Sequence, residues 1–214
     1  MSNRFWKSLS VCLDAIFFDD THTQYKDHKD QVFMDACKNG NTDIVDVWLM
    51  MDIVEIKSPI FDDTGPICEA STFGNVEVVD RLLQYTKKRL MVDPPESKNV
   101  ALMYAINNGH INVVDRLLQD DRVDPSSHDN IAFRLACNYN GHINVVDRLL
   151  QDDRVDPLIF DNYTARLAAA YSNIAIFDRL IQINAVRTSF EKSISKTSYF
   201  FCSSHRIKSL LAHC

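Results

Sequence analysis

The sequence predicts an all-α solenoid, built as a stack of about five helix-turn-helix repeats with a helical cap at each end. Eighteen residues, Asn108 to Pro125, recur without a change at Asn140 to Pro157, displaced by 32 residues. Four of the five glycines also share one position of a wider pattern. Because units of this size are too small to bury a core alone, copied units form a continuous core by stacking on their neighbours.

The glycine of each unit traces the repeat through five copies. The pattern G-[NH]-x-x-[IV]-V-D begins at Gly40, Gly74, Gly109 and Gly141, and Ser172 takes the glycine position in the fifth copy. This placement indicates a positive φ between two helices. Each unit is predicted to be a helix, a tight turn, a second helix and a polar loop that ends in Asp-Pro. In the third copy, the apolar residues that predict the second helix are Ile111, Val113, Val114, Leu117 and Leu118.

This unit resembles the ankyrin repeat, which has a period of about 33 residues and the signature T-P-L-H-x-A before a glycine turn. Residues 65–70 read G-P-I-C-E-A in that register. The fourth and fifth copies depart from it, with Arg134 and Arg166 where the family has histidine. The resemblance covers roughly residues 26–188. It is closest to the divergent Asp-Pro-linked arrays of large DNA viruses of protists and of intracellular microbes, which implies a possible host-interaction protein.

The repeat register divides the chain into three parts. Residues 1–25 are predicted to form an N-terminal capping helix, because Phe5, Leu9, Cys12 and Ile16 fall at helical spacing. Residues 189–214 are predicted to form a degenerate C-terminal repeat or cap. Between them lie the ankyrin-like repeats of residues 26–188, with expected boundaries at 26–59, 60–94, 95–125, 126–157 and 158–188.

Composition argues against several functional classes. The net charge of −6 offers no general attraction to nucleic acid or to anionic membranes, so we expect neither as a partner. No segment of the N-terminus matches a signal peptide or a membrane span. The six cysteines are dispersed, which indicates free thiols in a reducing compartment. We therefore expect a cytoplasmic monomer, in the host cytoplasm if the source is a virus or an intracellular microbe.

No catalytic or cofactor motif emerges from the residues, so we expect no enzyme, no cofactor and no metal. The carboxylates of the Asp-Pro loops are interpreted as turn-forming residues, because equivalent atoms of stacked repeats lie about 10 Å apart and cannot share a reacting group. His110 and His142 are expected to pack or hydrogen-bond at their turns, since they lie too far apart to share a zinc ion. Cys202, His205 and the terminal His213-Cys214 pair have metal-ligand types but poor geometry. The repeated Asp-Arg pairs, such as Asp80-Arg81, predict charge ladders across the second helices.

The predicted function is non-catalytic binding of a protein partner through the concave face. Two alternatives remain open: an adaptor that recruits a substrate to a host complex such as a ubiquitin ligase, and an enzyme. In the ankyrin-like register, loop tips and the exposed ends of the first helices line the concave face, and they vary between copies. Exposed aromatic residues among Asn and Asp are typical of contact hot spots. The predicted contact residues are Phe61, Asp62, Thr72, Phe73, Glu96, Ser97, Asn107, Asn108, Ser127, His128, Asn138, Tyr139, Asn140, Ile159, Phe160 and Tyr171.

Overall fold

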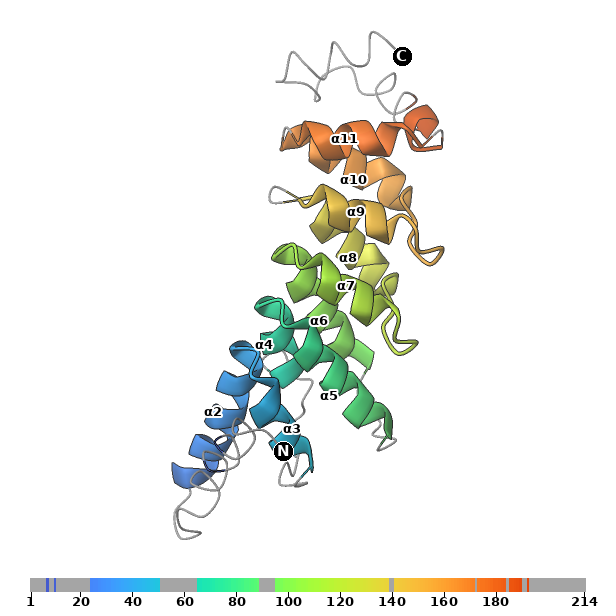
Figure 1. The fold of residues 1–214 in the computed structure, drawn as a ribbon. Helices are drawn as coiled ribbons and strands as arrows, with labels where there is room; N and C mark the ends of the chain where they lie inside the picture. Colours follow the sequence, from blue (N-terminus) through green and yellow to red (C-terminus); the bar gives the residue numbers. More distant parts are fainter. Residues whose placement is uncertain are drawn as a thin grey trace. The chain divides into compact units, whose positions relative to one another are not determined.

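The fold of this chain is all-helical, as predicted. The computed structural model describes residues 7, 10, 24–50, 65–88, 95–138, 141–171, 173–183, 185–189 and 192. For residues 24–30, 95–98 and 159–162 it describes the backbone but not the side chains. Among these residues, ten helices are labelled α2 to α11, residues 185–189 are also helical, and there is no strand (Figure 1). Most of the predicted N-terminal cap (1–25) and C-terminal segment (189–214) lies outside the described residues.

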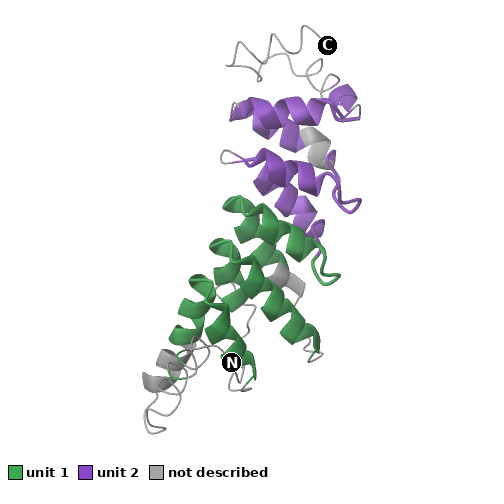
Figure 2. Cartoon of the chain, viewed as in Figure 1, with its two compact units in different colours: residues 1–123 green, residues 124–214 purple. Residues whose placement is uncertain are grey.

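The chain divides into two compact units, residues 1–123 and 124–214 (Figure 2). In unit 1 the first helices of three consecutive copies form one row, in which α4 contacts α2 and α6. The second helices form the other row, in which α5 contacts α3 and α7. The first-helix row consists of α2 (Gln24–Lys38), α4 (Pro66–Thr72) and α6 (Pro95–Asn107), and the second-helix row of α3 (Thr42–Met50), α5 (Val76–Lys88) and α7 (Ile111–Leu118).

Unit 2 repeats this arrangement with two copies. The helices are α8 (Ser127–Ala136), α9 (Ile143–Leu149), α10 (Ile159–Ala170) and α11 (Ile174–Ile181). Helix α8 contacts α9 of its own copy and α10 of the next, and α11 contacts both α10 and α9. Both units therefore have the nearest-neighbour contacts of a solenoid.

The core of unit 1 is made by the helical spacing of apolar residues in the second helices. Val113, Val114 and Leu117 of α7 are fully buried, as the sequence predicted, and Leu118 is 6% exposed. Small residues fill the first helices at the same depth, with Ala70 of α4 also fully buried. Each buried Val or Leu contributes about 1.5–3 kcal/mol relative to exposure. The two helix rows are therefore held together mainly by apolar packing.

Tight turns join the helices of each copy, and positive φ is confirmed at three of the repeated glycines. The φ angles are 70° at Gly40, 76° at Gly74 and 72° at Gly109. After α4, the Gly74 amide donates to the Ser71 carbonyl at 3.4 Å and the Asn75 amide to the Ala70 carbonyl at 2.9 Å. This pair of bonds is a Schellman motif, in which the residue after the helix adopts the left-handed conformation.

The fourth copy has an extra residue before its glycine, and the prediction of positive φ is wrong at Gly141. The Gly141 amide donates to the Asn138 carbonyl at 2.7 Å. A Cβ atom at Gly141 would lie 2.5 Å from the carbonyl oxygen of Ala136 and 2.4 Å from Cδ1 of Ile176. Glycine is required at this position because the Cβ atom of any other residue would collide with backbone atoms.

Candidate functional site

In two copies of unit 1, the residue after the glycine ties its turn to the preceding copy. The imidazole of His110 lies 2.9 Å through Nε2 from the carbonyl oxygen of Thr72, at the end of α4. Because a carbonyl only accepts, Nε2 carries the proton in this contact. The sequence-based expectation of a hydrogen bond at this turn is confirmed for His110. A Cβ atom on Gly74 would lie 2.7 Å from Nδ1 of the same ring, so Gly74 also makes room for His110.

The first and second copies are joined in the same way by an asparagine. The side-chain amide of Asn75 donates to the carbonyl oxygens of Cys37 at 2.8 Å and Lys38 at 2.7 Å, at the end of α2. A Cβ atom on Gly40 would lie 2.7 Å from Oδ1 of Asn75. These bonds satisfy helix-end carbonyls that would otherwise lack partners. The ends of the first helices in unit 1 are thereby fixed relative to one another.

Polar and aromatic side chains gather on these fixed helix ends in unit 1. Phe73, the residue after α4, is 48% exposed, and Tyr104 in the last turn of α6 is 37% exposed. The ammonium group of Lys38 lies 5.0 Å from the centroid of the Phe73 ring, a cation–π contact. We call this surface the turn-side face, and it consists of Lys38, Thr72, Phe73, Tyr104, Asn107 and Asn108.

Four of the predicted contact residues therefore lie together on the turn-side face. Asn107 and Asn108 are exposed at the end of α6, whereas Thr72 is half-buried and its hydroxyl donates to the Cys68 carbonyl at 2.8 Å. The Asn108 side chain donates to the Tyr104 carbonyl at 2.8 Å, so part of its hydrogen-bonding capacity closes α6. In unit 2, Tyr171 is 46% exposed after α10, and Asn138 is half-buried after α8.

For most of the predicted loop-tip residues, the structure describes either only the backbone or nothing. Phe61, Asp62, Tyr139 and Asn140 lie outside the described residues. Glu96 and Ser97 lie in the first turn of α6, with their side chains outside the description. Ile159 and Phe160 begin α10 and are limited in the same way. His128 is exposed at the start of α8, and Ser127 beside it is half-buried.

Tyr104 was missed by the sequence reasoning although helical periodicity could have identified it. Its neighbours Leu102, Ala105 and Ile106 are at most 1% exposed. Successive helical residues are about 100° apart, so position 104 falls on the face opposite to this buried stripe. The contact residues were predicted from positions that vary between copies, and the exposed face of each first helix was not examined for aromatic residues.

The predicted charge ladders are present on the second helices. In unit 1, Asp46 of α3 pairs with Arg81 of α5 at 2.9 Å, and Asp80 of α5 pairs with Arg116 of α7 at 2.5 Å. In unit 2, Asp147 of α9 pairs with Arg179 of α11 at 2.5 Å. Each rung joins consecutive copies, and each is partly exposed.

Two considerations keep the energy of each rung small. Exposed pairs contribute on the order of 0.5 kcal/mol. Burial also raises the pKa of Asp46 even though Arg81 acts to lower it. At this rung, burial together with the neighbouring Asp43 thus offsets the attraction of Arg81.

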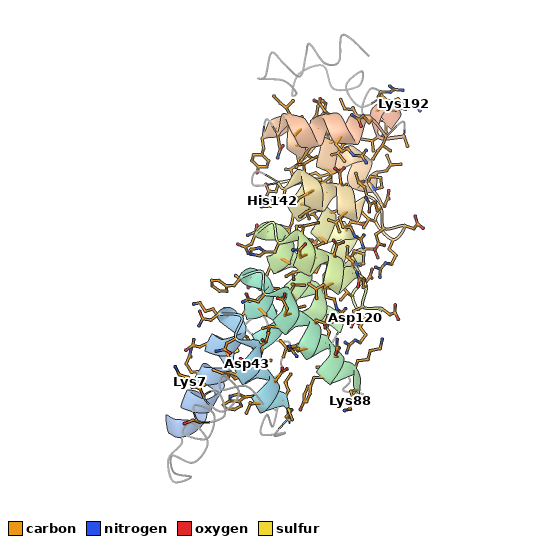
Figure 3. All side chains as sticks on the ribbon, in the orientation of Figure 1. Lys7, Asp43, Lys88, Asp120, His142 and Lys192 are labelled. Carbon is orange, nitrogen blue, oxygen red and sulfur yellow. The ribbon has the colours of Figure 1, made fainter. Side chains whose placement is uncertain are left out.

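The carboxylates of the Asp-Pro loops form turns, as predicted. Asp120 accepts two hydrogen bonds from Arg122, at 2.7 Å from Nε and 2.7 Å from Nη2. The same guanidinium donates to the Leu83 carbonyl and the Thr86 hydroxyl, both at 3.0 Å, at the end of α5. Figure 3 shows Asp120 on the edge of unit 1 where α5 ends at Lys88. The clamp fixes this loop to the preceding second helix.

The identical loop of the next copy repeats the clamp. Asp152 accepts from Nε of Arg154 at 2.8 Å and from Nη2 at 2.7 Å. The hydrogen bond from the Arg154 side chain is the main cause of the lowered pKa of Asp152. The aspartate before the proline of each loop also forms a turn. Asp124 accepts a hydrogen bond from the Ser126 amide at 2.9 Å, and Asp156 accepts one from the Leu158 amide at 2.8 Å. These contacts account for the carboxylates without a reacting group.

Asn130 joins the start of α8 to the Asp-Pro loop at the end of the same copy, a role that the sequence reasoning did not assign. Its side chain is 5% exposed, and its Oδ1 accepts the Asp156 amide at 3.1 Å. Arg134, in the register position of the ankyrin histidine, stacks over the Tyr163 ring at 5.4 Å. The contact between the start of α8 and this loop therefore comes from an asparagine four residues earlier. Asparagine recurs at this position as Asn99 and Asn162, which is the signal that could have revealed it.

The cysteines and the possible metal ligands are the remaining residues for which the sequence suggested a chemical role. Cys37, Cys68 and Cys137 are free and buried, and burial raises the pKa of the Cys37 and Cys137 thiols. Across the described ranges, no three His, Cys, Asp or Glu side chains gather as a metal site would require. Cys202, His205, His213 and Cys214 lie outside those ranges. Among the described helices, none has both the length and the apolar composition needed to cross a bilayer.

Comparison with known proteins identifies the repeat. The family model for ankyrin repeats, which contains three copies, matches residues 33–129. No curated protein matches the chain. Over the matched span the helix pairs, the glycine turns and the period all agree with this family, so residues 33–129 form ankyrin repeats. Ankyrin repeats are generally protein-protein interaction modules and are typically not enzymes.

Proposed function

We propose that this protein binds a protein partner through the exposed ends of its first helices, with the turn-side face of unit 1 as the main contact area. The observation that carries the proposal is the exposure of Phe73 and Tyr104 on helix ends that are otherwise fixed by hydrogen bonds. Exposed aromatic side chains on a rigid support lose little conformational entropy when a partner covers them.

The polar residues around the two rings complete a surface of the composition expected for recognition. Asn107 and Asn108 offer amide donors and acceptors, and Lys38 offers a cation beside the Phe73 ring. Aromatic anchors with a polar rim are the usual anatomy of a protein-protein interface. In unit 2, Tyr171 occupies the equivalent place after the first helix of its own copy.

A pull-down with matched variants tests this proposal. Phe73→Ala combined with Tyr104→Ala should lose the proteins that the wild-type chain captures from a lysate, because hot-spot truncations weaken binding by about tenfold or more each. Met50→Ala is the control, since Met50 is 75% exposed at the end of α3 and lies away from the turn-side face. The double variant should keep its helical circular dichroism. Identical capture by wild type and double variant would refute the proposal.

We also propose a reducing, cytoplasmic setting for this binding, supported by the free and buried thiols of Cys37, Cys68 and Cys137. Free thiols of this kind pack as small apolar groups in a helical core. If the partner-binding chain were recovered from an oxidising compartment with its thiols still reduced, this would argue against a cytoplasmic setting. The adaptor alternative depends on the terminal segments, which lie outside the described residues, and stays a prediction.

A further inference from the structure

The charge ladder of the second helices ends on an aspartate that has no arginine opposite it among the described residues. Asp178 holds the place in α11 that Asp147 holds in α9, where the carboxylate pairs with Arg179 of the following copy at 2.5 Å. In unit 1 the equivalent aspartates, Asp46 and Asp80, also pair with the arginine of the following copy. These three rungs show which side chain this position binds. Asp178 is therefore the open end of the ladder in unit 2.

The carboxylate of Asp178 is short of a hydrogen-bond donor. Within the part of the chain that the structure describes, its Oδ1 is shielded from solvent and accepts no hydrogen bond. The aspartate side chains of the three rungs are 36%, 37% and 42% exposed, and each accepts from a guanidinium group. A charged oxygen that is removed from water without a donor costs stability. A cation that fits the place of the rung arginine is therefore expected to complete the site.

A second copy of this chain does not offer that arginine at its first repeat. In the four later copies the rung arginine directly follows the aspartate, as Arg179 follows Asp178. In the first copy the residue after Asp46 is Val47, which is buried in unit 1 at 2% exposure. Head-to-tail stacking of two chains through this rung would therefore leave Asp178 without its partner.

Cations of the same chain follow close behind the open rung. Residues 193–214, which lie outside the described residues, contain Lys196, Arg206 and Lys208 and no Asp or Glu. Their charge is complementary to the unpaired carboxylate. Because they are tethered to α11 by a short stretch of chain, they meet Asp178 at a high effective concentration.

The apolar spacing of this segment selects one of the three cations. Residues 206–211 read R-I-K-S-L-L, which keeps three of the four apolar positions of the V-V-D-R-L-L pattern in the second helices. In a helix of that register, Ser209 would take the place of the rung arginine. Arg206 would lie one turn earlier on the same face, because residues three apart are neighbours on a helix. Lys208 would take the place of the aspartate, so the segment offers no acceptor that would extend the ladder.

We propose that Arg206 pairs with Asp178 and that this contact docks the C-terminal segment on the open end of unit 2. The segment then supplies the donor that the last rung needs and presents no aspartate to a further copy. Terminal units of a solenoid must differ from internal ones in this way, because an internal face left uncovered has no neighbour to satisfy it.

Hydrogen exchange of the full chain, followed by mass spectrometry over peptides from residues 199–214, measures the docking. Asp178→Asn and Arg206→Gln should each lower the protection of these peptides by about fivefold, relative to the intrinsic exchange rate of each sequence. The double variant should be no less protected than either single variant, because both substitutions remove the same contact.

Matched controls separate this pair from a general effect of charge. Asp153→Asn removes an exposed loop carboxylate of unit 2, and Lys208→Gln removes the tail cation nearest to Arg206. Each control should change the protection of the same peptides by less than about twofold. A loss with Lys208→Gln as large as that with Arg206→Gln would overturn the assignment of Arg206.

Three further results would overturn the inference. The first is a wild-type segment that exchanges as fast as a free peptide of the same sequence. The second is a double variant in which the losses from Asp178→Asn and Arg206→Gln add, since independent effects exclude a shared contact. The third is protection that falls on dilution of the protein, which would assign the donor to a second chain. None of these results bears on the proposed function, which depends on Phe73 and Tyr104 in unit 1.

Discussion

Replacement of Gly74 by alanine tests how the glycine turns fix the surface next to them. The new Cβ atom would lie 2.7 Å from Nδ1 of His110 and 3.0 Å from Cγ and Cε1, while the backbone keeps φ at +76°. The left-handed conformation costs alanine about 1 kcal/mol. Displacing the ring loses the hydrogen bond to the Thr72 carbonyl, worth about 1 kcal/mol. The free energy of unfolding should therefore fall by about 2 kcal/mol.

Urea unfolding followed by circular dichroism measures this loss, and a double-mutant cycle divides it. In a His110→Ala background the clash and the hydrogen bond are absent, so Gly74→Ala should cost only the backbone part, about 1 kcal/mol. The same cycle with Gly40→Ala and Asn75→Ala provides a parallel pair in the preceding turn, where the Cβ atom would lie 2.7 Å from Oδ1 of Asn75. Equal costs of Gly74→Ala in the presence and absence of His110 would refute the coupling.

Three further predictions concern the loops, their pH dependence and the thiols. Arg122→Ala should destabilise unit 1 by about 1–3 kcal/mol, because it leaves the 5% exposed side chain of Asp120 without its bidentate donor; urea unfolding at neutral pH measures this, and a change within error would contradict the clamp. Because the folded pKa of Asp152 is lowered below its ordinary 3.8, its stabilisation is complete at pH values above that figure and is lost as the pH falls below it. The stability difference between wild type and Asp152→Asn should thus shrink in acid, and a difference that grows in acid would reverse the sign. Cys37 and Cys137 should react with a thiol reagent only after unfolding, since burial keeps both thiols protonated; rapid labelling of the folded chain would place them at the surface.

The two identical segments show how far local sequence determines local structure. Residues 108–125 and 140–157 form the same second helix and the same Asp-x-Arg clamp, at Asp120 and again at Asp152. These features depend on contacts within a few residues, so they were predictable. The backbone before the helix differs, with ψ at 76° for His110 and 110° for His142. The residue inserted before Gly141 changes the path into the turn, and the repeated segment does not contain that information.

Features that depend on residues far apart in the sequence were harder to foresee. Asn130, at the end of the left-handed turn of residues 128–130, accepts the amide of Asp156 from the other end of the same copy, and neither residue alone indicates this bond. The exposure of Phe73 was predicted because it varies at a fixed position, whereas Tyr104 required the buried face of α6 to be known. The repeat thus predicts the scaffold, while the binding surface depends on which side chains the scaffold leaves uncovered.

The Asp-Arg rungs have a consequence for how such a chain can change its length. The second copy offers an aspartate toward the copy that follows and an arginine toward the copy that precedes, through Asp80 and Arg81 of α5. The contact is a head-to-tail one, and the second to fifth copies all have this Asp-Arg pair, whereas Asp46 of the first copy is followed by Val47. A duplicated copy inserted into the row would bring with it both charges needed to join its new neighbours. Growth by whole copies therefore requires no compensating substitution on this edge, and the exact duplication of eighteen residues in this chain is the outcome such an edge permits.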